Sequence, residues 1–94
     1  MTTYIFQGMT LPVSVQESIN AYVTTGRPTG GFLEAVINND LREAIVRADH
    51  INIRIIPAIV GYLYNECPAG CWGFSGAFDK WVEKHAAKRR LSNG

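Results

Sequence analysis

The chain has few of the residues that metal sites, disulfide frameworks and membrane spans require. Its 94 residues include two histidines and two cysteines. Cys67 and Cys71 have no second Cys or His pair nearby, so neither a zinc site nor a disulfide framework is indicated. No apolar run reaches the roughly 18 residues of a membrane span, and no N-terminal stretch has the form of a secretory signal. We therefore expect a soluble protein of the cytoplasm with free cysteines.

An excess of charge of either sign is also missing. The sequence has nine Lys and Arg residues and eight Asp and Glu residues, which gives a net charge of +1. General binders of duplex DNA carry a basic excess, so that class is disfavoured and any anion site has to be local. Hydrophobic residues make up 47% of the chain and charged residues only 18%, which is more apolar side chain than a small globule easily hides. We expect part of it to lie in an interface between copies of the chain.

A catalytic centre is difficult to assemble from this sequence. His50 and His85 are far apart, and each is next to charged or small residues. Asp40 and Glu43 resemble a helix cap, and Asp49 resembles a helix end. No Gly-Lys-Ser/Thr motif follows the glycines, so a nucleotide triphosphate P-loop is excluded. We expect a protein that is not an enzyme and that uses no metal or cofactor.

Apolar residues recur at helical spacing in four stretches, which predicts an all-α fold. The first stretch is residues 12 to 24, and Gly26 should end it. The second, residues 32 to 48, is interrupted at 38 to 40, where Asp40 and Glu43 fit a capping box. We expect its apolar stripe to continue through the break: Leu33, Ile37, Leu41, Ile45 and Ala48.

The third and fourth stretches carry their own start signals. Asn52 is the expected cap of the third, residues 52 to 66, and Pro57 inside it predicts a kink or a late start. Ser75 should cap the fourth, whose far end is basic.

Together these stretches predict one domain over residues 1 to 94. The short link between the second and third helices predicts an antiparallel helical hairpin, residues 28 to 73, as its core, with helices flanking it on the N- and C-terminal sides. Residues 1 to 9 are apolar and have no evident partner strand later in the chain. We expect them to form an arm that folds over the core or docks on a neighbouring subunit.

The loop at residues 26 to 31, Gly-Arg-Pro-Thr-Gly-Gly, is the strongest candidate for a binding site. Thr29 is placed to cap the following helix, and Gly30 and Gly31 leave its first amides open. Exposed amides at a helix start attract anions, and Arg27 adds a planar fork of donors that suits phosphate. The same residues are also common in turns that only connect helices, and local sequence alone favours such a connecting loop over a phosphate site.

Several short motifs resemble the phage anti-CBASS type 2 family and its shared helical hairpin. They follow one order between residues 28 and 73: Pro28-Thr29-Gly30-Gly31-Phe32-Leu33, Asn39-Asp40-Leu41 with Glu43-Ala44, Arg47-Ala48-Asp49, Tyr64-Asn65-Glu66 with Pro68, and Cys71-Trp72-Gly73. The resemblance implies a small helical protein that assembles as a hexamer. It would sequester cyclic dinucleotides and cyclic trinucleotides without cleaving them, in separate pockets between subunits, and so block CBASS immune signalling in the host cytoplasm.

The resemblance also implies ligand-binding residues. Arg27 would hold phosphate, while Thr29 and the segment Cys67 to Gly70 would approach the larger ring. The family's base-stacking tyrosine near the chain start has no unambiguous counterpart, so Tyr4 and Tyr22 are both candidates, and Tyr22 is alternatively a core residue. The predicted ligand-binding residues are Tyr4, Tyr22, Gly26, Arg27, Thr29, Gly30, Gly31, Cys67, Pro68, Ala69 and Gly70.

Two other functions compete with this prediction. A small phage adaptor would inhibit a host protein through an exposed apolar helix face and would be a monomer or dimer. A helix-turn-helix DNA-binding protein is suggested by the basic stretch Lys80 to Arg90. The near-neutral charge and the scarcity of basic side chains on the predicted hairpin argue against it.

Overall fold

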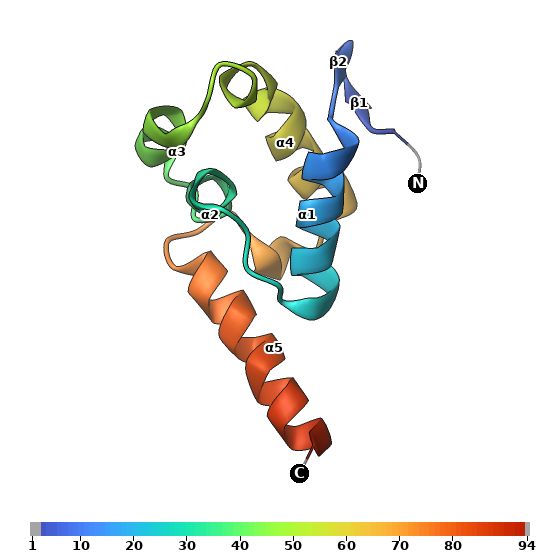
Figure 1. Ribbon diagram of the computed structural model, residues 1–94, viewed down its shortest axis with the longest axis vertical. Coiled ribbons are helices and arrows are strands. Elements are labelled where there is room, and N and C mark those ends of the chain that lie inside the picture. Colours follow the sequence, from blue (N-terminus) through green and yellow to red (C-terminus); the bar gives the residue numbers. More distant parts are fainter. Residues whose placement is uncertain (1–2, 94) are drawn as a thin grey trace.

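The computed structural model describes the backbone of residues 3 to 93 and the side chains of residues 3 to 91. The fold is mostly helical, as predicted, and adds a small hairpin of two strands (Figure 1). In chain order the elements are β1 (Ile5–Phe6), β2 (Met9–Thr10), α1 (Val13–Thr25), α2 (Gly31–Ile37), α3 (Leu41–Arg47), α4 (Asn52–Glu66), the 3-10 helix η1 (Ala69–Cys71) and α5 (Ala77–Asn93).

The N-terminal arm folds back over its own chain. Ile5 pairs with Thr10 and Phe6 with Met9 in antiparallel register, so the partner strand is the next one along the chain. The expectation that these residues lack a partner strand was therefore wrong. Both strands contact α4, and Phe6 packs against the core.

The first helix agrees with its prediction. α1 ends at Gly26, which adopts a left-handed conformation with φ of 74° and donates its amide to the carbonyl of Tyr22. Left-handed backbone costs glycine almost nothing, and this explains why the helix stops there.

The predicted break in the second stretch is confirmed, but the continuous stripe is wrong. Asp40 caps α3 by accepting a hydrogen bond at Oδ1 from the amide of Glu43, at 3.2 Å. Leu33 and Ile37 of α2 are buried, whereas Leu41 and Ile45 of α3 are 62% and 48% exposed. Left-handed backbone just before the cap, with φ of 58° at residue 39, redirects the chain, so α3 does not continue the face of α2.

Asp49, rather than Asn52, caps α4. Its Oδ1 accepts hydrogen bonds from the amides of Ile51 and Asn52, at 3.0 and 2.7 Å. The helix continues through Pro57, so the predicted late start was wrong. Proline removes one backbone donor, and α4 is long enough to retain its other bonds.

The start of α5 is also set differently from the prediction. The helix begins at Ala77, two residues after Ser75. The side chain of Asn38, at the end of α2, accepts a hydrogen bond from the amide of Phe78 at 2.9 Å. A residue 40 positions away in sequence therefore does what Ser75 was expected to do.

The main core draws on four helices and the segment before α1. Its buried residues are Leu11, Ile19, Leu33, Ala35, Val36, Ala44, Ile55, Ala58, Ile59, Tyr62 and Leu63. The hydroxyl of Tyr62 donates to Oδ1 of Asn20 and ties α4 to α1. The core therefore includes α1 as well as residues of the segment 28 to 73.

α5 packs on a second, smaller cluster and then leaves the body. The buried members of this cluster are Tyr22, Ile37, Cys71, Ala77 and Phe78. Figure 1 shows the far half of α5 extending away from the other helices, and the molecule measures 46 × 30 × 20 Å. No helix in the described part of the chain is long and apolar enough to cross a membrane.

Candidate functional site

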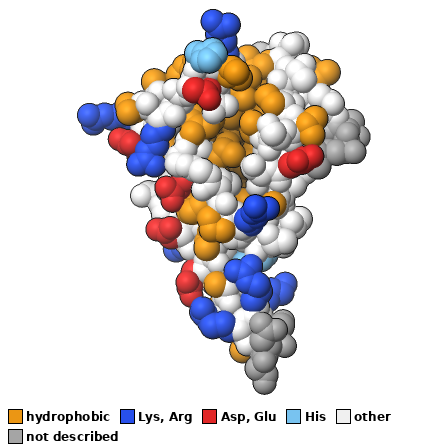
Figure 2. All heavy atoms as spheres, in the orientation of Figure 1, with side chains coloured by type: hydrophobic (Ala, Val, Ile, Leu, Met, Phe, Trp, Pro, Cys, Tyr) orange, Lys and Arg blue, Asp and Glu red, His pale blue; other side chains and the backbone are white. Residues whose placement is uncertain are grey.

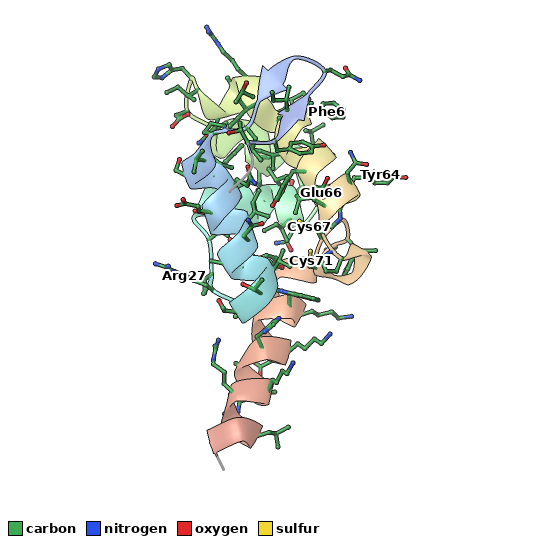
Figure 3. All side chains as sticks on the ribbon, turned by 90° about the vertical axis from the view of Figure 1, so that its right-hand side faces the viewer. Phe6, Arg27, Tyr64, Glu66, Cys67 and Cys71 are labelled. Atoms are coloured by element: carbon green, nitrogen blue, oxygen red, sulfur yellow. The ribbon has the colours of Figure 1, made fainter. Side chains whose placement is uncertain are left out.

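The loop around Arg27 and one face of α1 enclose a hollow of about 400 Å³, which we call the Arg27 hollow. Its lining residues are Ser14, Glu17, Ser18, Ala21, Arg27, Pro28, Thr29 and Gly30. The Arg27 side chain is exposed and points away from the body (Figure 3). Within the described residues it has no hydrogen bond or ion pair. Its guanidinium donors are therefore available to a ligand.

The α1 side of the Arg27 hollow is polar. Ser14, Ser18 and Ala21 recur at helical spacing and place two hydroxyl groups on the face toward the loop. Glu17 lies on the same face and contributes a negative charge. An anion in this hollow is attracted to Arg27 and repelled by Glu17, so we expect its charged group to bind on the loop side.

Thr29 lines the hollow but does not cap α2. Its hydroxyl donates to the carbonyl of Gly30 at 3.0 Å, and α2 begins at Gly31 without a side-chain cap. The predicted role of Thr29 as a helix cap was wrong. Because its donor is used locally, the hydroxyl can serve a ligand only as an acceptor.

The three glycines of the loop differ in what surrounds them. An added Cβ would meet nothing within 4 Å at Gly30, so a ligand can approach the backbone there. At Gly31 it would lie 2.7 Å from Nη1 of Arg47, and at Gly26 it would clash with the Cβ of His85. Of the three predicted glycines, only Gly30 lines the hollow, and Gly26 and Gly31 allow close packing.

Tyr22 is a core residue and not a residue that stacks on a base. The side chain is 0% exposed, and its ring stacks on Phe78 with centroids 5.4 Å apart. Its hydroxyl donates to the carbonyl of Cys71 at 2.8 Å, and burial raises the pKa of this hydroxyl. A ring packed in this way has no free face for a base.

Tyr4 lies on the other side of α1 from the Arg27 hollow. Its amide donates to Oε1 of Gln16 at 3.3 Å, and its ring meets the edge of Tyr62 with centroids 5.1 Å apart. The 100° step of an α-helix places Gln16 opposite Ser14 and Ser18. Within one chain, Tyr4 and Arg27 therefore do not share a site.

The segment Cys67 to Gly70 is also separate from the Arg27 hollow. Figure 3 shows Arg27 at one side of the molecule, Tyr64 at the other, and Cys67 between them. Pro68, Ala69 and Gly70 are exposed, whereas Cys67 is half-buried and burial raises its pKa to about 12. The structure confirms that both cysteines are free. If this segment and the loop share a ligand, they must come from different copies of the chain.

A second feature is an apolar surface on α3 and α4, which we call the apolar face. Its exposed members are Leu41, Ile45, Val46, Val60 and Tyr64, with exposed fractions from 37% to 76%. A hollow of about 330 Å³ adjoins it, lined by Phe6, Pro57, Val60, Gly61, Tyr64 and Asn65. Exposed apolar side chains of this kind are a common feature of interaction sites.

The sequence analysis missed the α1 half of the Arg27 hollow. The i, i+4, i+7 spacing of Ser14, Ser18 and Ala21 was the signal that could have revealed it. Among the described residues, no group of three or more His, Cys, Asp or Glu side chains is arranged to hold a metal ion.

Comparison with protein-family models, curated proteins and solved structures found no match to this chain. The resemblance to the anti-CBASS type 2 family therefore depends on the short motifs alone.

Proposed function

We propose that this protein is a non-catalytic binding protein that sequesters cyclic oligonucleotides, with Arg27 holding a phosphate. The observation that carries the proposal is an exposed guanidinium, without a partner in the described part of the chain, at the mouth of a hollow of about 400 Å³. This volume falls in the range of small-molecule pockets, about 300 to 1,000 Å³. Guanidinium groups suit phosphate because their planar donors bind two oxygens at once.

Self-association is the second part of the proposal, with a hexamer as the assembly. A cyclic dinucleotide has two phosphates related by an approximate two-fold axis, and a cyclic trinucleotide has three around a three-fold axis. A symmetric interface presents the same residue to each phosphate, so copies of Arg27 can serve all of them. The exposed apolar face provides surface for such contacts, and it includes Leu41 and Val46.

Sequestration also agrees with the chemistry of the lining residues. A protein that works by mass action needs tight sites and no turnover. By removing cyclic second messengers from the host cytoplasm, it would block CBASS signalling. Arg27, Ser14, Ser18 and Thr29 supply binding groups, and Glu17 is the one carboxylate among the hollow's lining residues.

The experiment that tests this proposal is a calorimetric titration against a panel of cyclic di- and trinucleotides. After saturation, the complex is digested with protease and the released ligand is chromatographed. We expect binding to at least one ring and stoichiometric recovery of the intact ring. A linear product that accumulates with time would show an enzyme. Absence of binding across the panel would reject the proposal.

A second candidate is an adaptor that inhibits a host protein through the apolar face. The exposure of Leu41 and Val46, 62% and 70%, favours it. The oligomeric state separates the two candidates, because an adaptor that keeps this face free for a host protein should be a monomer or dimer. Sedimentation at micromolar concentration provides this measurement.

A further inference from the structure

A third hollow, of about 320 Å³, lies between the last turn of α1 and α5. Its five lining residues are Thr24, Thr25, His85, Lys88 and Arg89, so three are basic and none is acidic. We call it the basic hollow. Thr25 lines this hollow and Arg27 lines the Arg27 hollow, with only Gly26 between them in sequence. Figure 2 shows Lys and Arg side chains gathered on the protruding helix.

The basic side chains of this hollow share one face of α5. His85, Lys88 and Arg89 follow the i, i+3, i+4 spacing that brings side chains together on a helix. The nearby ion pair between Glu83 and Arg90, at 2.9 Å, lies on the opposite face by the 100° helical step. Glu83 therefore does not neutralise the charges of the basic hollow.

The end of α1 would normally repel an anion, because a helix C-terminus exposes carbonyl oxygens. Here several of these oxygens already accept hydrogen bonds. The indole of Trp81 donates to the carbonyl of Tyr22 at 3.0 Å, and Nη1 of Arg89 donates to the carbonyl of Thr25 at 2.7 Å. The negative end of α1 is thus partly neutralised. Lys88 is exposed and has no partner among the described residues.

His85 is held at this hollow by packing. It lies against Gly26 and beside the Trp81 ring, with ring centroids 5.1 Å apart. Partial burial, followed by the charges of Lys88, Lys84 and Arg89, lowers its pKa. The α1 side of the hollow adds the hydroxyls of Thr24 and Thr25 and no charge. An anion bound among these cations would counteract their effect and favour the imidazolium form.

We infer that the basic hollow binds the phosphate group of a phosphate monoester, with Lys88 and Arg89 matching its two negative charges and His85 donating a ring N–H. A monoester carries close to two negative charges at neutral pH, whereas each phosphodiester of a cyclic nucleotide carries one. This site is therefore distinct from the Arg27 hollow and does not depend on the function proposed above. Each site can be tested alone.

The test measures the pKa of His85 by proton NMR, with sulfate as the probe because it remains a dianion between pH 5 and about 8. Spectra are titrated in sodium sulfate and in sodium chloride at equal ionic strength. We expect sulfate to raise the pKa of His85 by about one unit, the size typical of one close opposite charge. His50 lies in the link between α3 and α4, at the end of the molecule away from the tip of α5 (Figure 1), so it reports general salt effects in the same spectrum and should not respond.

Two variants locate the site. Lys88→Gln should remove most of the sulfate-induced shift, whereas Lys80→Gln, on the same helix but outside the hollow, should retain it. No shift at His85, an equal shift at His50, or an equal loss in both variants would overturn the inference. Dimethyl phosphate, a monoanionic diester, is the second probe. A response as large as that to sulfate would overturn the assignment to a monoester.

Discussion

The ring of Phe6 in the N-terminal hairpin lies directly on Gly61 of α4, and a Cβ on Gly61 would be 2.6 Å from Cδ1 of the ring. Two non-bonded carbon atoms cannot lie so close together, so the ring or the helix would have to move. The absence of a side chain at this position is therefore what allows the hairpin to cover α4.

We expect Gly61→Ala to lower the free energy of unfolding by about 1 to 3 kcal/mol, the usual cost of overpacking. Chemical denaturation measures it. Gly70→Ala is the matched control, because an added Cβ there meets nothing within 4 Å. In a Phe6→Ala background the Gly61→Ala change should cost much less. An equal cost in both backgrounds would contradict the proposed contact.

Arg27→Ala should weaken the binding of cyclic dinucleotides without changing the melting temperature. A charge-assisted hydrogen bond is worth about 1.5 to 3 kcal/mol, which corresponds to roughly a 10- to 150-fold increase in Kd. Arg42→Ala removes another exposed arginine, on α3 and outside the Arg27 hollow, and should leave Kd unchanged. Equal effects of the two substitutions would show that the protein attracts the ligand only by its general charge.

Val46→Glu should dissociate the assembly. Val46 is 70% exposed in the isolated chain, so a charge there costs the fold little, but it would be buried in an interface formed by the apolar face. Sedimentation should show wild-type protein several times heavier than the 10.4 kDa chain and Val46→Glu close to that mass. Val13→Glu, at an apolar α1 position that is 46% exposed, is the control. A monomeric wild type at micromolar concentration would contradict self-association.

Neither cysteine should react rapidly with iodoacetamide in the folded protein. Burial raises the pKa of Cys67 to about 12, and at pH 8 such a thiol is ionised in about one molecule in ten thousand. Cys71 is 0% exposed, and burial raises its pKa as well. Mass spectrometry should find little alkylation in native buffer and two additions in guanidinium chloride. Rapid modification of native Cys67 would contradict the structure.

Local sequence signals predicted most of the helices because the relevant interactions lie within a few residues of each other. Gly26 ends α1 through its own left-handed backbone, and Asp40 caps α3 three residues away. The start of α5 could not be predicted in this way, because the side chain that binds its first turn, Asn38, is 40 residues distant.

The candidate site was predicted only in part for a similar reason. Arg27 and Gly30 were found because they lie in one short loop, but the serines opposite them belong to the polar face of α1. Whether that face meets solvent or the loop depends on how the chain turns at Gly26. Tyr22 was wrongly included among the candidate ligand-binding residues for a related reason. The local sequence around a tyrosine on a helix is the same whether its ring is buried in the core, as here, or exposed to a ligand.

Positive and negative charges are unevenly distributed along the molecule, although its net charge is only +1. α5 holds five of the nine Lys and Arg residues and two of the eight Asp and Glu residues, so the remaining body is negative. The chain is therefore an electric dipole aligned with its protruding helix. An approaching anion is guided first to that helix, and the guidance weakens steeply once the Debye length falls to about 8 Å in physiological salt.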